Sequence, residues 1–179
     1  MKKKTLWITQ TAAMLALLIA LQWATKPLGQ RVSGSCVNTV LAVSALLCGL
    51  SSGLTVALLS PLFAYFWGIA PNLIAVPVIM VGNALLVLLL STLSGNQIWK
   101  RIVAWLAAAV AKFAAMYALI TWVICGLAAD FLLSQGVLKA PMLKMLPTTF
   151  SWPQLVTALI GGGIALLIVP VLKKALRRA

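Results

Sequence analysis

Apolar residues in this chain come in long runs separated by short polar or turn-rich segments. The first run, residues 6–24, is about as long as a helix needs to cross a bilayer (~20 residues). Five more runs follow it, and together they predict membrane-spanning helices over residues 6–24, 37–50, 54–67, 74–92, 102–127 and 155–172. We therefore expect an all-α integral membrane protein, a six-transmembrane-helix bundle that forms a single domain over residues 1–179.

The composition supports a membrane location. Of the 179 residues, 63% are hydrophobic and 8% are charged, and a soluble domain could not cover so much apolar surface with so few charges. Lysines 2–4 followed by an apolar run also resemble a signal peptide. However, the run is long, it lacks a convincing small-x-small cleavage site, and five more runs follow, so we expect it to be retained.

Basic residues predict how the bundle is oriented. An even number of spans places both chain ends on one side, and that side carries nine of the lysines and arginines outside the spans, against four on the other. Because cytoplasmic loops are rich in Lys and Arg, we expect both termini in the cytoplasm. We expect the protein itself to be a multi-pass protein of a bacterial-type plasma membrane. The nine are Lys2, Lys3, Lys4, Lys100, Arg101, Lys173, Lys174, Arg177 and Arg178, and the four are Lys26, Arg31, Lys139 and Lys144.

Several function classes are excluded by what the sequence lacks. The net charge is +13, but the basic residues flank apolar runs instead of forming a patch interleaved with aromatics, which argues against nucleic-acid binding. There is no histidine, and Asp130 is the only acid, so general acid–base catalysis has almost nothing to use. Cys36, Cys48 and Cys125 show no CxxC spacing. We predict no catalytic residue, no metal site and no cofactor; ATP hydrolysis, if it drives transport, needs another subunit.

The three predicted outer connections carry the most unusual loop sequences. They cover residues 25–36, 67–73 and 133–153. The third is the longest and keeps many apolar residues, so we expect it to pack over the bundle or to lie on the membrane surface. Such a segment could act as a lid.

Three polar side chains lie deep in predicted spans. Lys112 is near the middle of the fifth, where a lone ammonium is costly. Either it is deprotonated or hydrogen-bonded in the core, or it lines a cavity that receives an anionic ligand. Asn83 lies in the fourth span and Asn38 in the second. Both amides need hydrogen-bond partners in lipid, which an interhelical bond or a ligand would supply.

Small residues form a stripe on the first predicted helix. Ala12, Ala16 and Ala20 fall four residues apart, so they stack on one helical face. Such a stripe allows another helix to approach closely. The partner is either a helix of the same bundle or a separate membrane protein.

These features together resemble one family. Six short spans, two cytoplasmic ends and an alanine ladder resemble the substrate-binding S components of energy-coupling factor (ECF) transporters. The resemblance implies a subunit that binds a vitamin or related micronutrient near its outer face, in a pocket built mostly from helices four to six and the outer loops. It also implies docking of the first helix on a transmembrane T component, which is driven by two cytoplasmic ATPase subunits.

Residue assignments follow from the resemblance only in part. Ala12 and Ala16, with Ala20, are the implied docking positions. The pocket is carried over by region, and its candidates are the polar or aromatic residues there: Asn72, Asn83, Lys112, Tyr117, Trp122 and Trp152. The chain lacks the extra N-terminal helix and early histidine of nickel and cobalt members, so we do not expect metal uptake.

The substrate remains open at this stage. The binding motifs of riboflavin, thiamine and biotin members are not found, and Lys112 in an acid-poor chain favours a carboxylate- or phosphate-bearing organic molecule. The alternative is an accessory or assembly subunit without a ligand. A polar cavity containing Asn83 or Lys112 under an ordered outer loop would favour binding, whereas a solid bundle with Lys112 turned to the lipid would favour the accessory role.

Overall fold

The computed structural model describes residues 2–70 and 72–176, and within them it contains helices and no strand. Arg177 and Arg178, which count toward the predicted orientation, lie outside the described residues. The elements are α1 (Lys2–Thr25), η1 (Lys26–Leu28), α2 (Gln30–Val43), η2 (Ser44–Cys48), α3 (Leu50–Phe66), α4 (Ala75–Leu93), α5 (Ile98–Ala118), η3 (Leu119–Leu127), α6 (Ala129–Ser134), α7 (Ala140–Thr149) and α8 (Trp152–Leu176).

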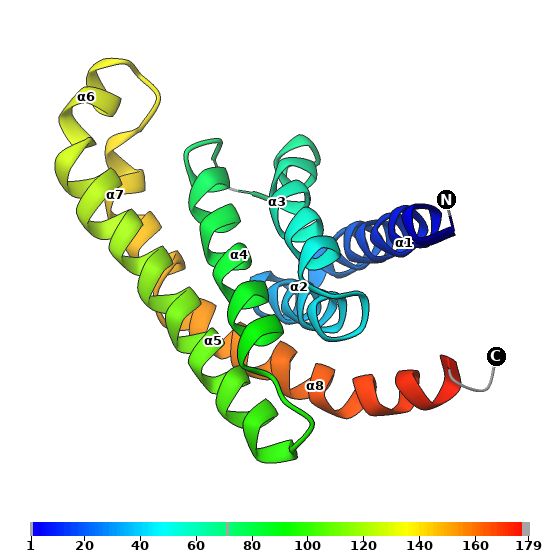
Figure 1. The fold of residues 1–179 in the computed structure, drawn as a ribbon. Helices are drawn as coiled ribbons and strands as arrows, with labels where there is room; N and C mark the ends of the chain where they lie inside the picture. The colour runs from blue at the N-terminus through cyan, green and yellow to red at the C-terminus, as the bar shows by residue number, and fades with distance from the viewer. Residues whose placement is uncertain (1, 71, 177–179) are drawn as a thin grey trace.

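The helices form one bundle in which neighbours along the chain and distant segments pack together. The closest pairs are α2 with α8, α4 with α5, and α3 with α4, while α1 packs on α2 and α3. Figure 1 shows the start of α1 and the end of α8 on the same side of the bundle, with α6 and α7 on the other. The connections α1–α2, α3–α4 and α7–α8 therefore belong to the end opposite these two helix ends.

Five helical stretches of the described chain are long and apolar enough to cross a membrane. They are Lys4–Leu28, Gln30–Cys48, Ala75–Leu93, Ile98–Leu127 and Ala140–Leu176. The remaining predicted span, residues 54–67, falls on α3, which is apolar but has only 17 residues. Its last turns include Pro61, which has no backbone N–H to donate to the helix.

Two predicted outer loops are largely helical. The helix α2 begins at Gln30, seven residues before the predicted span at 37, because Gly29 adopts a φ of 87° and turns the chain directly from η1 into α2. The segment 133–153 contains α7, whose Leu146 is buried together with Phe150. This apolar face packs over the ends of α4 and α5, as expected for a segment that covers the bundle.

The contact between α2 and α8 depends on a glycine. A Cβ added to Gly161 would lie 2.6 Å from the backbone oxygen of Ser35 and 2.6 Å from Cβ of Asn38. The two backbones can therefore approach this closely only without a side chain here, which is the usual role of small residues between membrane helices. Two residues later, a Cβ on Gly163 would meet Trp105 at an ordinary 3.5 Å.

We predict that Gly161→Ala destabilises the protein by about 1–3 kcal/mol, because the added methyl group must push α8 away from α2. The measurement is the thermal unfolding midpoint of the purified protein in detergent. Gly163→Ala is the matched control, and its midpoint should stay the same or rise slightly, since alanine favours a helix over glycine by about 1 kcal/mol. Equal midpoints for the two variants would contradict this account of the interface.

Candidate functional site

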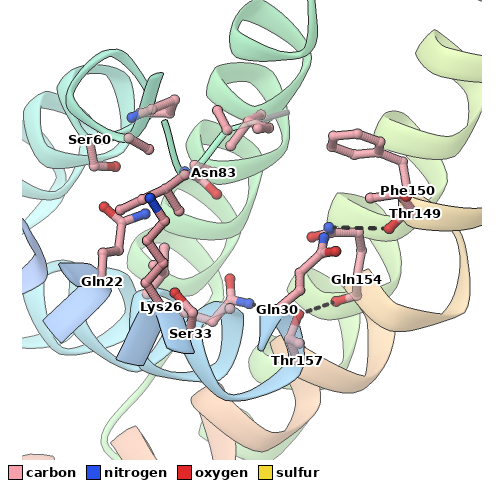
Figure 2. Close-up of a pocket in the computed structure, with 18 of the residues that line it drawn as sticks. Gln22, Lys26, Gln30, Ser33, Ser60, Asn83, Thr149, Phe150, Gln154 and Thr157 are labelled. Atoms are coloured by element: carbon pink, nitrogen blue, oxygen red, sulfur yellow. Dashed lines mark hydrogen bonds between the residues drawn. The ribbon is translucent and has the colours of Figure 1, made fainter. Parts of the chain in front are cut away.

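A cavity of about 340 Å³ opens at the end of the bundle where α1, α3 and α7 finish and α2, α4 and α8 begin. Figure 2 shows the side chains that surround it. Its labelled polar residues are Gln22, Lys26, Gln30, Ser33, Ser60, Asn83, Thr149, Gln154 and Thr157. Much of the wall comes from the three predicted outer connections, which the resemblance implied together with helices four to six, and the first three predicted spans also contribute to it.

Lys112 lies at the centre of a buried hydrogen-bond network. Its ammonium Nζ donates to Oδ1 of Asn38 at 2.6 Å and to Oδ1 of Asn83 at 2.7 Å, and the side chain is 3% exposed. Asn38 in turn donates from Nδ2 to Oγ1 of Thr157 at 3.2 Å. The network joins α2, α4, α5 and α8, so it fixes the helices that surround the cavity.

The structure thus answers part of the question posed by Lys112. The side chain is hydrogen-bonded in the interior, and it also lines the cavity. Its partners are neutral amides. Within the described residues no carboxylate neutralises it, because Asp130 is the only acid of the chain and lies exposed on α6.

Two residues that line the cavity each have a buried polar atom without a partner in the described chain. Nδ2 of Asn83 and Oγ of Ser60 have no hydrogen bond within the described part of the chain, and both side chains are 1% exposed. Buried polar atoms are nearly always satisfied, which makes these two groups candidates for contact with a ligand. Away from the cavity, the hydroxyls of Ser44, Ser91, Ser94 and Thr121 also lack a partner in the described chain.

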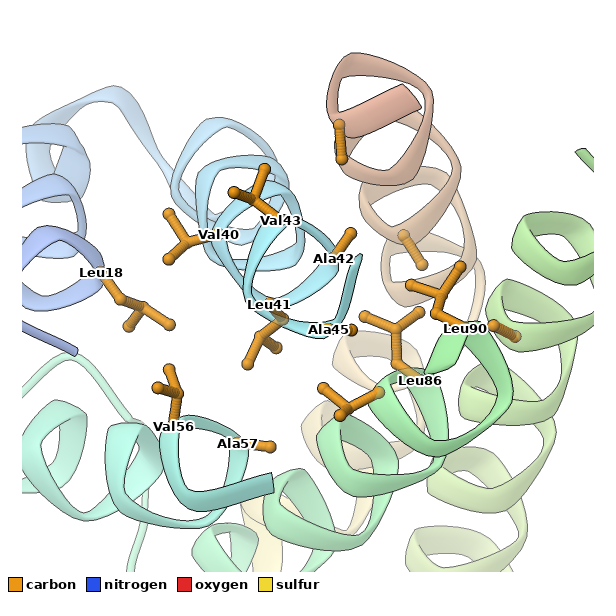
Figure 3. Close-up of a cluster of buried hydrophobic side chains, with 14 of the residues drawn as sticks. Leu18, Val40, Leu41, Ala42, Val43, Ala45, Val56, Ala57, Leu86 and Leu90 are labelled. Carbon is orange, nitrogen blue, oxygen red and sulfur yellow. The ribbon is translucent and has the colours of Figure 1, made fainter. Parts of the chain in front are cut away.

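An apolar core closes the cavity on the side of the α1 start and the α8 end. Figure 3 shows side chains from α1, α2, α3 and α4 that meet there, among them Leu18, Leu41, Val56 and Leu86. All four are fully or almost fully buried. A molecule in the cavity therefore has no open path toward that side.

Two polar contacts hold the segments that cover the open end. Nζ of Lys26 in η1 donates to the backbone oxygen of Trp67 at 3.2 Å, which ties the α1–α2 connection to the end of α3. Nδ2 of Asn72 donates to Sδ of Met142 at 3.4 Å, which ties the segment before α4 to α7. The predicted third outer segment also reaches the cavity, through Met145, Thr149 and Phe150.

The predicted pocket residues separate into two groups. Asn83 and Lys112 line the cavity, whereas Asn72, Tyr117, Trp122 and Trp152 do not. Tyr117 and Trp152 border a second, shallower cleft on the surface, and both stack on the ring of Phe113. Trp122 is 69% exposed on η3. A role of these residues in binding stays a prediction.

Several cavity residues were missed in the sequence. Gln22, Gln30 and Ser60 lie on the first three helices, and Gln154 lies with Thr157 on α8. One signal was available: Gln154 and Thr157 are three residues apart, and therefore on one face of a helix. Gln30 lies in the predicted outer connection 25–36, which the resemblance placed at the pocket, whereas nothing in the sequence brought Gln22 or Ser60 there.

The alanine stripe lies on the outside of the bundle. Ala12, Ala16 and Ala20 are all exposed, while Thr11 and Leu18 on the same helix are buried against the other helices. The stripe is therefore not used for packing within the described chain. Docking of the stripe on a separate membrane protein stays a prediction.

Comparison with known proteins gives one match. A family model described as "ECF transporter, substrate-specific component" matches residues 8–173, which is nearly the whole chain. Searches of curated proteins and of solved structures find no match.

We predict that the Lys112 network couples two positions energetically. Asn38→Leu removes one of the two acceptors of the ammonium and should destabilise the protein by about 1–3 kcal/mol. Combining it with Lys112→Met should cost less than the sum of the single variants, with a coupling of about 0.5–3 kcal/mol.

Unfolding free energies of the two single variants and the double variant measure this coupling. Thr39→Val is the control, because Thr39 neighbours Asn38 and its hydroxyl bonds only the oxygen of Ser35 on its own helix. Strict additivity of Asn38→Leu and Lys112→Met would contradict the network.

Proposed function

Since the chain belongs to the family of substrate-specific components of ECF transporters, we propose that the cavity around Lys112 is its substrate site. The observation that carries this proposal is a polar-lined cavity of about 340 Å³ inside an otherwise apolar bundle. Concave sites with a few convergent polar groups are the usual form of small-molecule sites. Membership in the family implies a small-molecule substrate and association with transmembrane and ATPase components.

In this proposal the protein is the specificity subunit of an ATP-driven uptake transporter for a vitamin or related small organic molecule. All six apolar helices cross the membrane, with both termini in the cytoplasm, so the cavity opens to the outside. The apolar core around Leu41 and Leu86 seals the cytoplasmic side. The substrate enters past η1 and α7, which cover the open end.

The protein does not hydrolyse ATP itself in this proposal. The T component binds the outer face of α1, where the exposed Ala12, Ala16 and Ala20 allow close helix contact. The ATPase subunits act on that scaffold from the cytoplasm.

The proposed substrate is an anion that carries a carboxylate or phosphate. Two lysines, Lys26 and Lys112, line the cavity, and the lining includes no acid. A buried ammonium that has only amide partners is stabilised by an opposite charge nearby. An organic anion in the cavity supplies that charge.

The alternative is an accessory subunit without a ligand. That role would be favoured by a solid bundle in which Lys112 turns toward the lipid. The buried position of Lys112, the cavity beside it and the cover formed by α7 support substrate binding instead.

We predict that an anionic, vitamin-like compound co-purifies with the protein in mild detergent at near-equal stoichiometry, because the cavity buries most of a small ligand. Mass spectrometry of the extracted small molecules measures this. Lys112→Met should lose the compound while still eluting as a folded protein. Retention of the same amount would remove Lys112 from the site, and no ligand together with no stabilisation by any added micronutrient would favour the accessory role.

We predict that Ala16→Trp abolishes co-purification with the T component, since an indole on the stripe prevents close helix contact, and that it leaves ligand binding intact. Affinity capture of the co-expressed complex measures the association. Ala114→Trp is the control, because Ala114 is exposed on α5, away from the stripe. Normal complex formation by Ala16→Trp would contradict docking through α1.

A further inference from the structure

We propose that the substrate is a compact, non-aromatic monocarboxylate that carries hydroxyl or amide groups. Its carboxylate binds at the deep end of the cavity, to Lys112, Asn83 and Ser60. This inference rests on the proposed function and adds the chemical class and orientation of the ligand.

The deep end of the cavity, formed by Lys112, Asn83 and Ser60, has hydrogen-bond donors that no other described residue uses. An ammonium has three N–H donors, and Lys112 spends two of them on Asn38 and Asn83. Because an ammonium can only donate, its contact with Asn83 fixes the amide with Oδ1 toward Lys112. Nδ2 of Asn83, which has no partner among the described residues, is then a donor beside the ammonium.

Ser60 adds a further donor from α3, which packs against α4. Its hydroxyl is buried, lines the cavity and has no partner in the described part of the chain. A carboxylate accepts several hydrogen bonds through its two oxygens. It therefore satisfies at once the free ammonium hydrogen, the Asn83 amide and the Ser60 hydroxyl, three groups that are each at least nine-tenths buried.

The charge of the deep end favours a carboxylate over a phosphate. Lys112 is the one cation there, and no arginine lines the cavity in the described chain. Phosphate sites typically use arginine forks or several cations. The second lysine, Lys26, sits in η1 and donates to the Trp67 carbonyl. A monoanion thus balances the single positive charge of Lys112. A phosphate dianion would leave one negative charge buried without a partner, which is costly.

The other residues of the cavity wall indicate the chemistry of the part of the ligand beyond its carboxylate. Phe150 is the only aromatic residue among the described lining residues, so the cavity has no pair of rings between which an aromatic substrate would stack. Gln22, Gln30 and Gln154 provide neutral amides from α1, α2 and α8, which both donate and accept. Hydroxyl or amide groups on the ligand match them. The volume of about 340 Å³ is near the low end for ligand sites, about 300–1,000 Å³.

The test uses matched pairs of probes on the purified full-length protein. The panel contains short aliphatic monocarboxylates with hydroxyl or amide groups, each beside its primary-amide analogue and its phosphate-ester counterpart. Isothermal titration calorimetry measures binding. At least one acid should bind, and its amide and phosphate counterparts should bind at least about tenfold more weakly, since charge-assisted hydrogen bonds are lost or the charge is mismatched.

Asn83→Asp then places a carboxylate of the protein where that of the ligand would bind. The new Asp pairs with Lys112, so the unliganded variant should unfold at the wild-type temperature or above it, while affinity for the acid falls at least about a hundredfold. Asn96→Asp is the matched control, because Asn96 is exposed in the α4–α5 connection and does not line the cavity, and it should bind the acid as wild type does. Wild-type affinity in Asn83→Asp overturns the proposal.

Ser60→Ala gives a second variant in case Asn83→Asp does not fold. It removes a hydroxyl that bonds nothing in the described chain, so folding should be unaffected and affinity for the acid should fall several-fold. Binding of a phosphate-bearing micronutrient in place of the acids overturns this inference and leaves the proposed function standing. Binding of a neutral or cationic micronutrient overturns the anionic substrate as well, but not the role of a substrate-binding subunit. Failure to bind any compound overturns both.

Discussion

The structure depends on how a single ammonium is accommodated among apolar helices. Among the described residues, Nζ of Lys112 donates to Asn38 on α2 and to Asn83 on α4, and Asn38 donates to Thr157 on α8. Because a charged group in hydrocarbon is stabilised only by such contacts, the helices cannot separate here without a large cost. The same polar cluster of Lys112, Asn38, Asn83 and Thr157 lines the cavity. The hydrogen bonds that hold the helices together therefore also place polar groups at the site.

Composition along the chain predicted the apolar spans and the polar residues within them. It did not predict which face of each helix points to the cavity and which points to lipid. Lys112 and Asn83 were found because polar residues stand out in apolar runs. The start of α2 was missed since polar residues after Gly29 are typical of a loop, although they face the cavity rather than lipid. Trp122 was a candidate only because it is an aromatic residue in the region of the implied pocket, and region alone does not say which face of a helix a residue occupies; on η3, a π-helix, it is 69% exposed.

The cover of the cavity is held differently from its floor. At the floor, buried charge and amides meet at 2.6 and 2.7 Å. At the opening, an exposed lysine contacts one backbone carbonyl, and an amide contacts one methionine sulfur. Exposed contacts of this kind contribute little, and η1 has no buried residue, so local opening should occur in η1 long before the polar cluster separates. The buried apolar face of α7 holds that helix more firmly. The site therefore combines a rigid base with a cover that a substrate can displace.

The uncompensated position of Lys112 also has an electrical consequence. A positive charge inside the bundle feels the membrane voltage, and moving one elementary charge across 100 mV changes the free energy by about 2.3 kcal/mol. A bound carboxylate cancels that charge. If the bundle reorients in the membrane, a bound carboxylate would therefore lower by one the charge that moves through the field, while the basic residues at the two ends of the bundle would carry the rest. The proposed cargo would thus change how strongly the membrane potential acts on the protein.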